Sequence, residues 1–189
     1  MEIFIVLVLI VLHGFLVLGE IALLTAKRSR LEGEKLKGNQ NAVIAVRLLD
    51  NIDNYLSAMQ IGITLISIVE GAYAGVSIGH RLEPVVAMVP ALAPYAEQIS
   101  ISIVVTLITY LSLIIGELAP KYIAIQYADA LAIACAPVMN IITRITGPIS
   151  AFLSWSTKMF MRLLFIKPND QQSISEDEIK HMVEMANQQ

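Results

Sequence analysis

The sequence contains little charge. Asp, Glu, Lys and Arg together make up 15% of its 189 residues, whereas soluble domains carry roughly a quarter. Apolar residues reach 56% and are gathered in long blocks, which excludes an ordinary soluble domain. We therefore expect an all-α integral membrane protein embedded in a lipid bilayer.

The sequence also lacks the motifs of several other protein classes. Cys135 is the single cysteine, so an internal disulfide is excluded and the redox compartment stays open. The basic residues flank apolar segments instead of forming a patch with interleaved aromatics, which argues against nucleic-acid binding. Neither a nucleophile motif nor a metal-histidine motif occurs, so no catalytic residues and no enzyme are predicted. An intramembrane hydrolase using paired carboxylates is a further alternative.

Three apolar blocks predict transmembrane helices at about residues 3–26, 55–78 and 98–119, each close to the length needed to cross a bilayer. The first block begins with Glu2 instead of a basic residue, and no small-x-small cleavage site precedes the basic cluster after it. We therefore expect an uncleaved span and not a signal peptide.

The distribution of lysine and arginine predicts the orientation. Six basic residues lie between the first two blocks, only Arg81 lies between the second and third, and Lys121 follows the third. By the positive-inside rule the N-terminus is outside and the C-terminus cytoplasmic, in a plasma or bacterial inner membrane. Within the first loop, residues 29–53 have helical character and predict a short hairpin of helices.

The segment at about residues 130–166 is ambiguous. Prolines and charged residues divide it into stretches that each look too short to span, so we predict amphipathic helices at the cytoplasmic interface. A fourth span kinked at Pro148 is the alternative. The predicted transmembrane domain thus covers 1–166, and the polar residues 167–189 begin a linker to a further domain.

Glu117 is the most informative residue. It follows Gly116 at the end of the third apolar block and precedes Pro120 and Lys121. A carboxylate on a membrane helix usually marks an ion or substrate path. The proline is expected to break the helix and free an upstream carbonyl beside the acid, and such oxygens hold hard cations.

Helix periodicity predicts which other polar groups share its surroundings. His13 and Glu20 fall on one face of the first span. Thr106 and Glu117 fall on one face of the third, with Ser102 and Thr109 close to the same side. The second span carries a polar and small stripe that must face protein or water in a bilayer: Ser57, Gln60, Thr64, Ser67 and Gly71. We expect the three faces to meet, with Glu20 and Glu117 at similar depth.

Structural roles remain open for each of these residues. Glu117 could only cap the broken helix, and Glu20 could pair with Lys27 or Arg28. The stripe could serve helix packing, and His13 could be a satisfied interior histidine. Glu70 is placed toward the outer end near His80 and Arg81, in a structural or snorkelling role within a separate outer polar cluster.

The run Gly116-Glu117-Leu118-Ala119-Pro120-Lys121 resembles the G-E-x-x-P-K signature of the transmembrane domain of the cyclin M (CNNM) and CorB/CorC proteins. Gly19-Glu20-Ile21-Ala22-Leu23 with the basic residues after it is similar to the family's first helix. Gln60-Ile61-Gly62-Ile63-Thr64-Leu65 is similar to the start of the second. The tail from Ser173 to Ile179 resembles the acidic helix that leads to a pair of CBS domains.

The resemblance implies a homodimer of three-span domains that transports Mg²⁺, commonly by efflux coupled to Na⁺, with a nucleotide-binding CBS pair in the full-length protein. It implies that Glu117 helps to bind the ion. Further members of the implied site are Gly116, Thr64, Ser67 and Glu20, and the residues implied in structure or gating are Gly19, Gly62, Pro120 and Lys121.

The sequence departs from the common family pattern at three positions. Many members carry a serine where this chain has Gly19, and asparagines where it has Ile63 and Ser67. With fewer side-chain oxygens, Mg²⁺ coordination must depend on Glu117, carbonyls and water, or the cargo differs. Transport of another cation such as Na⁺ or a polyamine, and a non-transporting scaffold or sensor, are therefore the alternative functions.

Overall fold

The computed structural model describes residues 1–163, apart from the side chains of Ser154 and Lys158. The predicted linker at 167–189 and the last three residues of the predicted interfacial segment lie outside the described residues. The chain divides into two compact units, Met1–Leu153 and the part from Ser154 onward. The elements that form the site described below all belong to the first unit.

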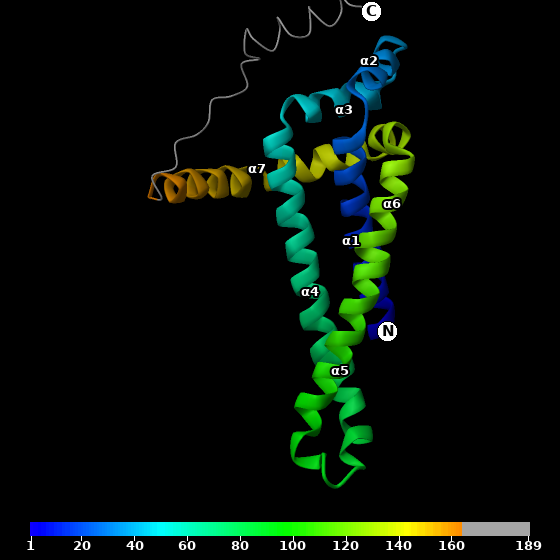
Figure 1. Ribbon diagram of the computed structural model, residues 1–189, viewed down its shortest axis with the longest axis vertical. Coiled ribbons are helices and arrows are strands. Elements are labelled where there is room, and N and C mark those ends of the chain that lie inside the picture. Colours follow the sequence, from blue (N-terminus) through cyan, green and yellow to red (C-terminus); the bar gives the residue numbers. More distant parts are fainter. Residues whose placement is uncertain (164–189) are drawn as a thin grey trace, which may run out of the picture. The chain divides into compact units, whose positions relative to one another are not determined.

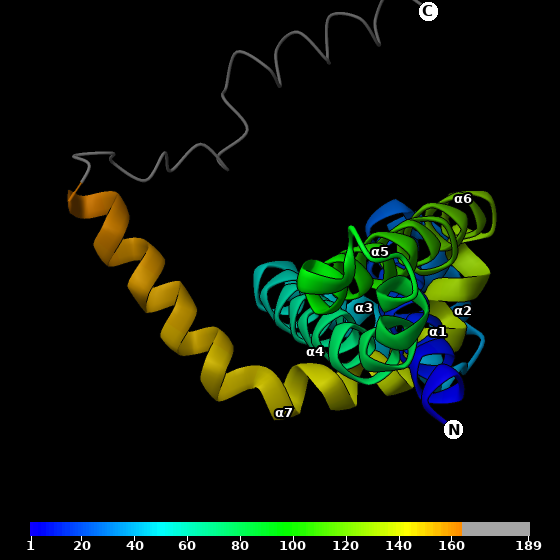
Figure 2. The ribbon, with the colours of Figure 1, turned by 90° about the horizontal axis from the view of Figure 1, so that it is seen from below.

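Three long helical stretches form the body of the first unit (Figures 1 and 2). They are α1 (Glu2–Thr25), α4 (Ile52–Ala87), and a third stretch built from α5 (Ala96–Leu111), the π-helix η2 (Ser112–Leu118) and α6 (Ala119–Gln126). A short 3₁₀ turn, η1 (Ala93–Tyr95), precedes α5. The helix α4 packs against both α1 and α5, while α1 packs against η2 and α6.

The prediction of an all-helical membrane protein is confirmed. Among the described residues, four helical stretches are long and apolar enough to cross a membrane by length and composition. The three predicted spans fall within α1, α4 and the stretch Ala93–Gln126, and the fourth candidate is α7 (Ala128–Leu163).

The expectation that prolines divide residues 130–166 into short pieces was wrong. The helix α7 runs for 36 residues with Pro137 and Pro148 inside it. An internal proline removes one hydrogen bond and kinks a helix, but tertiary contacts let the helix continue. In the first unit, Ala132, Cys135 and Met139 of α7 are buried in a core that α1, α3 and α4 also form. This part of α7 runs across α1 and α4 instead of parallel to them (Figure 1). The placement of this segment at the membrane interface, and not as a fourth span, remains a prediction.

The predicted helical hairpin between the first two spans is present. It consists of α2 (Arg28–Leu36) and α3 (Gln40–Asp50). Gly38 turns the chain with a φ of 89°, a left-handed conformation that favours glycine. The Asn39 side chain then accepts hydrogen bonds from the backbone N–H groups of Asn41 and Ala42 and so caps α3.

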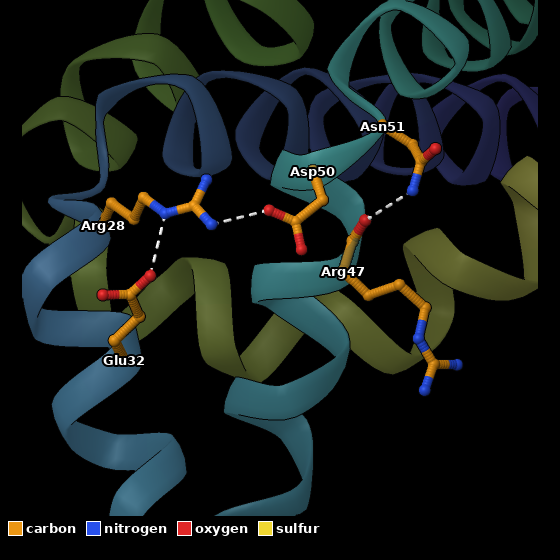
Figure 3. A network of polar contacts seen from close by, with 5 residues as sticks. All are labelled: Arg28, Glu32, Arg47, Asp50 and Asn51. Carbon is orange, nitrogen blue, oxygen red and sulfur yellow. Dashed lines mark hydrogen bonds and ion pairs between the residues drawn. The ribbon is translucent and has the colours of Figure 1, made fainter.

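A polar network joins the two helices of the hairpin (Figure 3). The Arg28 guanidinium donates to Glu32 over 2.8 Å within α2 and to Asp50 of α3 over 2.7 Å. At the end of α3, the Asn51 side chain donates to the Arg47 carbonyl. The bonds to Glu32 and Asp50 raise the pKa of Arg28 above its usual value, so this exposed contact stays charged.

The buried apolar residues form two clusters, and α1 contributes to both. Leu16, Ala22 and Leu23 of α1 belong to the larger cluster, which includes the hairpin and the start of α4. Val6 and Ile10 belong to the smaller one, with Ala74 of α4 and Val104 of α5. The polar residues His13 and Glu20 of α1 belong to neither cluster.

Candidate functional site

A pocket of about 480 Å³ lies between α1, α4 and the end of the third stretch. Four of the predicted site residues line it together, namely Glu20, Thr64, Ser67 and Glu117. Lys121, predicted to act in structure or gating, is also part of its wall. The complete described lining is His13, Val17, Glu20, Gln60, Ile63, Thr64, Ser67, Ile68, Glu117 and Lys121.

Helical spacing explains why these residues meet. On α1 the lining residues are three or four positions apart from His13 to Glu20, and on α4 the spacing from Gln60 to Ser67 is the same. Residues at such spacings project from one side of a helix. The prediction that the polar faces of the first two spans meet near Glu117 therefore agrees with the geometry. The predicted roles of the individual residues in ion binding remain predictions.

Glu117 does not lie at a break in the helix, as the proline suggested. It lies in the π-helix η2, in which hydrogen bonds join residues five positions apart. The Ala119 N–H, for example, donates to the Ile114 carbonyl. Pro120 is the second residue of α6, which follows the π-helix without a gap. The helical stretch therefore continues through the proline by way of a π-helix, and π-helical turns are frequent at functional sites.

Glu117 has a basic partner. Its Oε1 lies 2.6 Å from the Nζ of Lys121, one helical turn further along. The carboxylate is 36% exposed and the lysine side chain 39% exposed. Both line the pocket, so the ion pair borders open space instead of filling it.

The polar side chains of α4 present oxygen to the pocket. The Ser67 hydroxyl donates to the Ile63 carbonyl over 2.9 Å, which leaves its lone pairs available as acceptors. The Gln60 amide nitrogen donates to the Thr64 hydroxyl over 3.3 Å, so the amide oxygen also remains available. Ile63 lies on the same wall and offers no side-chain oxygen.

Three glycines allow the helices to approach closely. A Cβ on Gly116 would lie 3.2 Å from the His13 ring nitrogen, and one on Gly62 would lie 3.0 Å from the Leu16 side chain. A Cβ on Gly19 would collide with the end of the Met139 side chain. Gly116, predicted as a member of the ion site, is buried and lines neither pocket around Glu117.

The placement of Glu70 near the outer end was wrong. Glu70 is buried, with 2% of its surface exposed, and lines a smaller pocket of about 170 Å³ adjoining the first. The Ser112 hydroxyl donates to its Oε2 over 3.2 Å, and the His13 Nδ1 is 3.7 Å from the same oxygen. Sequence reasoning missed this group because three helices contribute one member each. The one signal in the sequence was that His13 shares a helix face with Glu20, which indicated that His13 points toward the interior.

The outer polar cluster forms without Glu70. Arg81 pairs with Glu2 over 2.7 Å and thereby joins α4 to the start of α1. His80 lies 3.5 Å from Glu83 on α4. This cluster is solvent-exposed and contributes to neither pocket around Glu117.

The polar face predicted on the third span is only partly correct. Thr109 lines the smaller pocket, whereas Ser102 and Thr106 are exposed and line neither pocket around Glu117. A π-helix has more residues per turn than an α-helix. Counting at α-helical spacing across Ser112–Leu118 therefore misplaces Thr106 relative to Glu117.

The larger pocket offers two carboxylates, two hydroxyls and one amide. Within residues 1–163, no three His, Cys, Asp or Glu side chains lie close enough to hold a metal by themselves. Hard cations such as Mg²⁺ take oxygen ligands, and Mg²⁺ usually keeps several waters while binding one or two carboxylates. The arrangement is thus suited to a hydrated cation and offers no cage for a dehydrated one.

Known proteins similar to this chain identify its family. Residues 4–189 match the sequence profile described as the cyclin M transmembrane N-terminal domain. The UPF0053 protein sll0260 of Synechocystis is 42% identical over 188 residues, which are 100% of this chain and 42% of that protein. The UPF0053 protein YhdT of Bacillus subtilis is 32% identical over 178 residues, covering 93% of this chain and 39% of the relative. The chain therefore spans about two fifths of the length of these relatives. The sequence match confirms the resemblance seen in the G-E-x-x-P-K run, and the chain belongs to the cyclin M (CNNM) transmembrane domain family.

Proposed function

We propose that this domain transports Mg²⁺ out of the cell, in exchange for Na⁺. The observation that carries the proposal is the pocket in which Glu117 and Glu20 meet hydroxyl and amide oxygens from α4. Acidic side chains on membrane helices mark ion paths, and transporter sites lie where helices with interrupted geometry meet. The family assignment supports the same class of function.

The oxygen set of the pocket suits Mg²⁺ that keeps part of its water. Glu117 is the proposed anchor, and Glu20 contributes attraction from the opposite helix. Thr64, Ser67 and the carbonyl of Gly116 are proposed as further ligands, directly or through water. Gly19 and Gly62 are proposed to set the spacing of α1 against its neighbours, and Pro120 to maintain the π-helical turn.

Lys121 has a specific role in this proposal. In the structure its ammonium group is 2.6 Å from the Glu117 carboxylate oxygen. A bound cation would compete with the ammonium group for this oxygen. A lysine on a flexible stem can leave when a divalent cation arrives. Lys121 therefore serves as a tethered counter-charge that compensates Glu117 between transport events.

The surroundings of the domain follow from the same proposal. The basic hairpin of α2 and α3 faces the cytoplasm, the N-terminus lies outside, and the protein resides in the plasma or bacterial inner membrane. Two copies form a homodimer. Since the relatives are longer than this chain, a cytoplasmic CBS pair that binds nucleotide is proposed to bias the transport cycle.

The test is Mg²⁺ flux from vesicles reconstituted with wild-type protein or Glu117→Gln. The amide keeps the shape of the side chain but removes its charge, so flux is expected to fall at least about tenfold, as for loss of a charge-assisted contact. Glu97→Gln is the matched control, since Glu97 is exposed and lines neither pocket around Glu117. Wild-type flux in a folded Glu117→Gln variant would contradict the proposal.

A second candidate is transport of another cation, such as Na⁺ alone or a polyamine. The apolar Ile63 on the pocket wall favours it, since this side chain offers no ligand to Mg²⁺. Equilibrium binding titrations with Mg²⁺, Na⁺ and spermidine separate the two proposals. Saturable Mg²⁺ binding that depends on Glu117 supports the first, and binding of only the other cations supports the second.

A further inference from the structure

Glu70 is the one acidic side chain among residues 1–163 that is buried. It lies in the middle of α4, a candidate membrane span, and faces the smaller pocket. A buried carboxylate is unfavourable unless it is paired or neutralised. The group that balances the charge of Glu70 therefore bears on the function of the protein.

The protein groups around Glu70 supply no permanent positive charge. From η2, Ser112 donates its single hydroxyl hydrogen to Glu70. The His13 Nδ1 of α1 is 3.2 Å from the Ser112 oxygen. Since the serine hydrogen is already used, the His13 Nδ1–H satisfies this contact by donating to the serine oxygen.

The remaining walls of the smaller pocket carry no basic side chain either. Its second charged residue is Glu117, another acid, and none of its described lining residues is lysine or arginine. Lys121 lines only the larger of the two pockets and is bonded to Glu117. The lining also includes Ser67 and Gly71 of α4 and Ile108, Thr109 and Leu113 of the third stretch.

We propose that this smaller pocket is a second cation site, separate from the one at Glu117 and suited to a monovalent ion of the size of Na⁺. The Glu70 carboxylate is its anchor. The hydroxyl oxygens of Ser67, Thr109 and Ser112 supply neutral ligands, since all three line the pocket. One positive charge neutralises one buried carboxylate.

The size of the pocket separates the two kinds of ion. Mg²⁺ dehydrates reluctantly and needs space for its waters, which the larger pocket of about 480 Å³ provides. The smaller pocket has about 170 Å³ and one buried acid with neutral hydroxyls. A singly charged ion that gives up its water more readily fits this set better.

The geometry also links the two sites. His13, Ser67 and Glu117 line both pockets. An ion at Glu70 therefore shares lining residues and electrostatic field with an ion at Glu117. Each ion then changes the binding affinity of the other by the same factor. The role of the second ion as the coupling ion rests on the transport function proposed above, whereas the existence of the site does not.

Equilibrium binding of ²²Na⁺ to the purified chain, without Mg²⁺ and without transport, tests the site directly. We expect Glu70→Gln to weaken Na⁺ binding by roughly tenfold or more, with Mg²⁺ binding changed less than about threefold. Thr109→Val removes a neutral ligand at an exposed position and is expected to weaken Na⁺ binding by roughly threefold to tenfold. Glu97→Gln, which alters an exposed acid outside the pocket, should bind Na⁺ as the wild type does.

Three outcomes would overturn the second site. The first is Na⁺ binding that is unchanged in both Thr109→Val and Glu70→Gln. If Glu70→Gln does not fold, unchanged Na⁺ binding in Thr109→Val alone has the same meaning. Another is an equal loss of Na⁺ binding in Glu117→Gln and Glu70→Gln, which indicates a single site. The third is wild-type protein that binds no Na⁺. A failure of Mg²⁺ flux to depend on Glu117 instead refutes the proposed function and leaves Na⁺ binding at Glu70 standing.

Discussion

Replacing Lys121 by methionine examines the proposal that the lysine competes with the transported ion. Methionine keeps an apolar side chain of similar length and removes only the charged end. In the wild type, the incoming cation must separate the Nζ of Lys121 from the Glu117 oxygen, a contact of 2.6 Å. In the variant that contact is absent, so cation binding should become tighter.

The structure sets the size of the effect. Two unit charges at this distance attract by about 1.6 kcal/mol in a dielectric close to that of water. The side chains are 39% and 36% exposed, so solvent screening and the entropy of ordering reduce the net value to about 1 kcal/mol or less. That energy corresponds to a change of up to roughly fivefold in the dissociation constant.

The assay is isothermal titration of Mg²⁺ into the purified protein in detergent, compared between Lys121→Met, Lys121→Arg and the wild type. Arginine retains the charge, so its affinity should stay near the wild-type value or below it. Lys37→Met is the matched control, because Lys37 forms a similar 2.7 Å ion pair with Glu34 on α2, away from the pocket. Weaker Mg²⁺ binding in Lys121→Met would refute the reasoning, since the lysine would then hold Glu117 in its binding position.

Two further predictions concern the fold around the site, measured by thermal unfolding in detergent. Asn39→Ala removes the side-chain acceptor that caps α3 and should destabilise the protein by about 1 kcal/mol. Asn54→Ala, at an exposed position on α4, should change little, and an equal effect of the two would contradict the capping role. Gly79→Ala places a Cβ 3.3 Å from the Ile101 backbone where α4 meets α5, and should cost about 1–3 kcal/mol. A Cβ on Gly33 would have no neighbouring atom within 4 Å, so Gly33→Ala should leave stability unchanged or raise it slightly. Equal melting temperatures for the two glycine variants would argue against close packing of α4 on α5.

Much of the pocket could be predicted from helical spacing alone. Glu20 on α1 and the pair Thr64 and Ser67 on α4 were expected to face Glu117, and all four line one pocket. The prediction works because a helix in a bilayer must turn its polar side chains toward protein or water. Periodicity within one helix then identifies the side that faces inward.

The errors share a different cause. Glu70 lies closer in sequence to His80 and Arg81 than to its actual neighbours His13 and Ser112, which come from other helices. Thr106 was misplaced because the π-helix between it and Glu117 changes the number of residues per turn. Likewise, tertiary contacts let α7 continue through Pro137 and Pro148.

The amino-acid sequence by itself determined an all-helical membrane domain, its family, and Glu117 as the main candidate residue of the site. Those properties depend on hydrophobic length, on local spacing and on the run from Gly116 to Lys121, which are all local features of the sequence. Only the tertiary structure decided that Glu117 lines one open pocket with side chains of α1 and α4, and that Glu70 is buried against His13 and Ser112. Such partners depend on how far each helix is rotated and displaced against the next, and packing between helices sets those quantities.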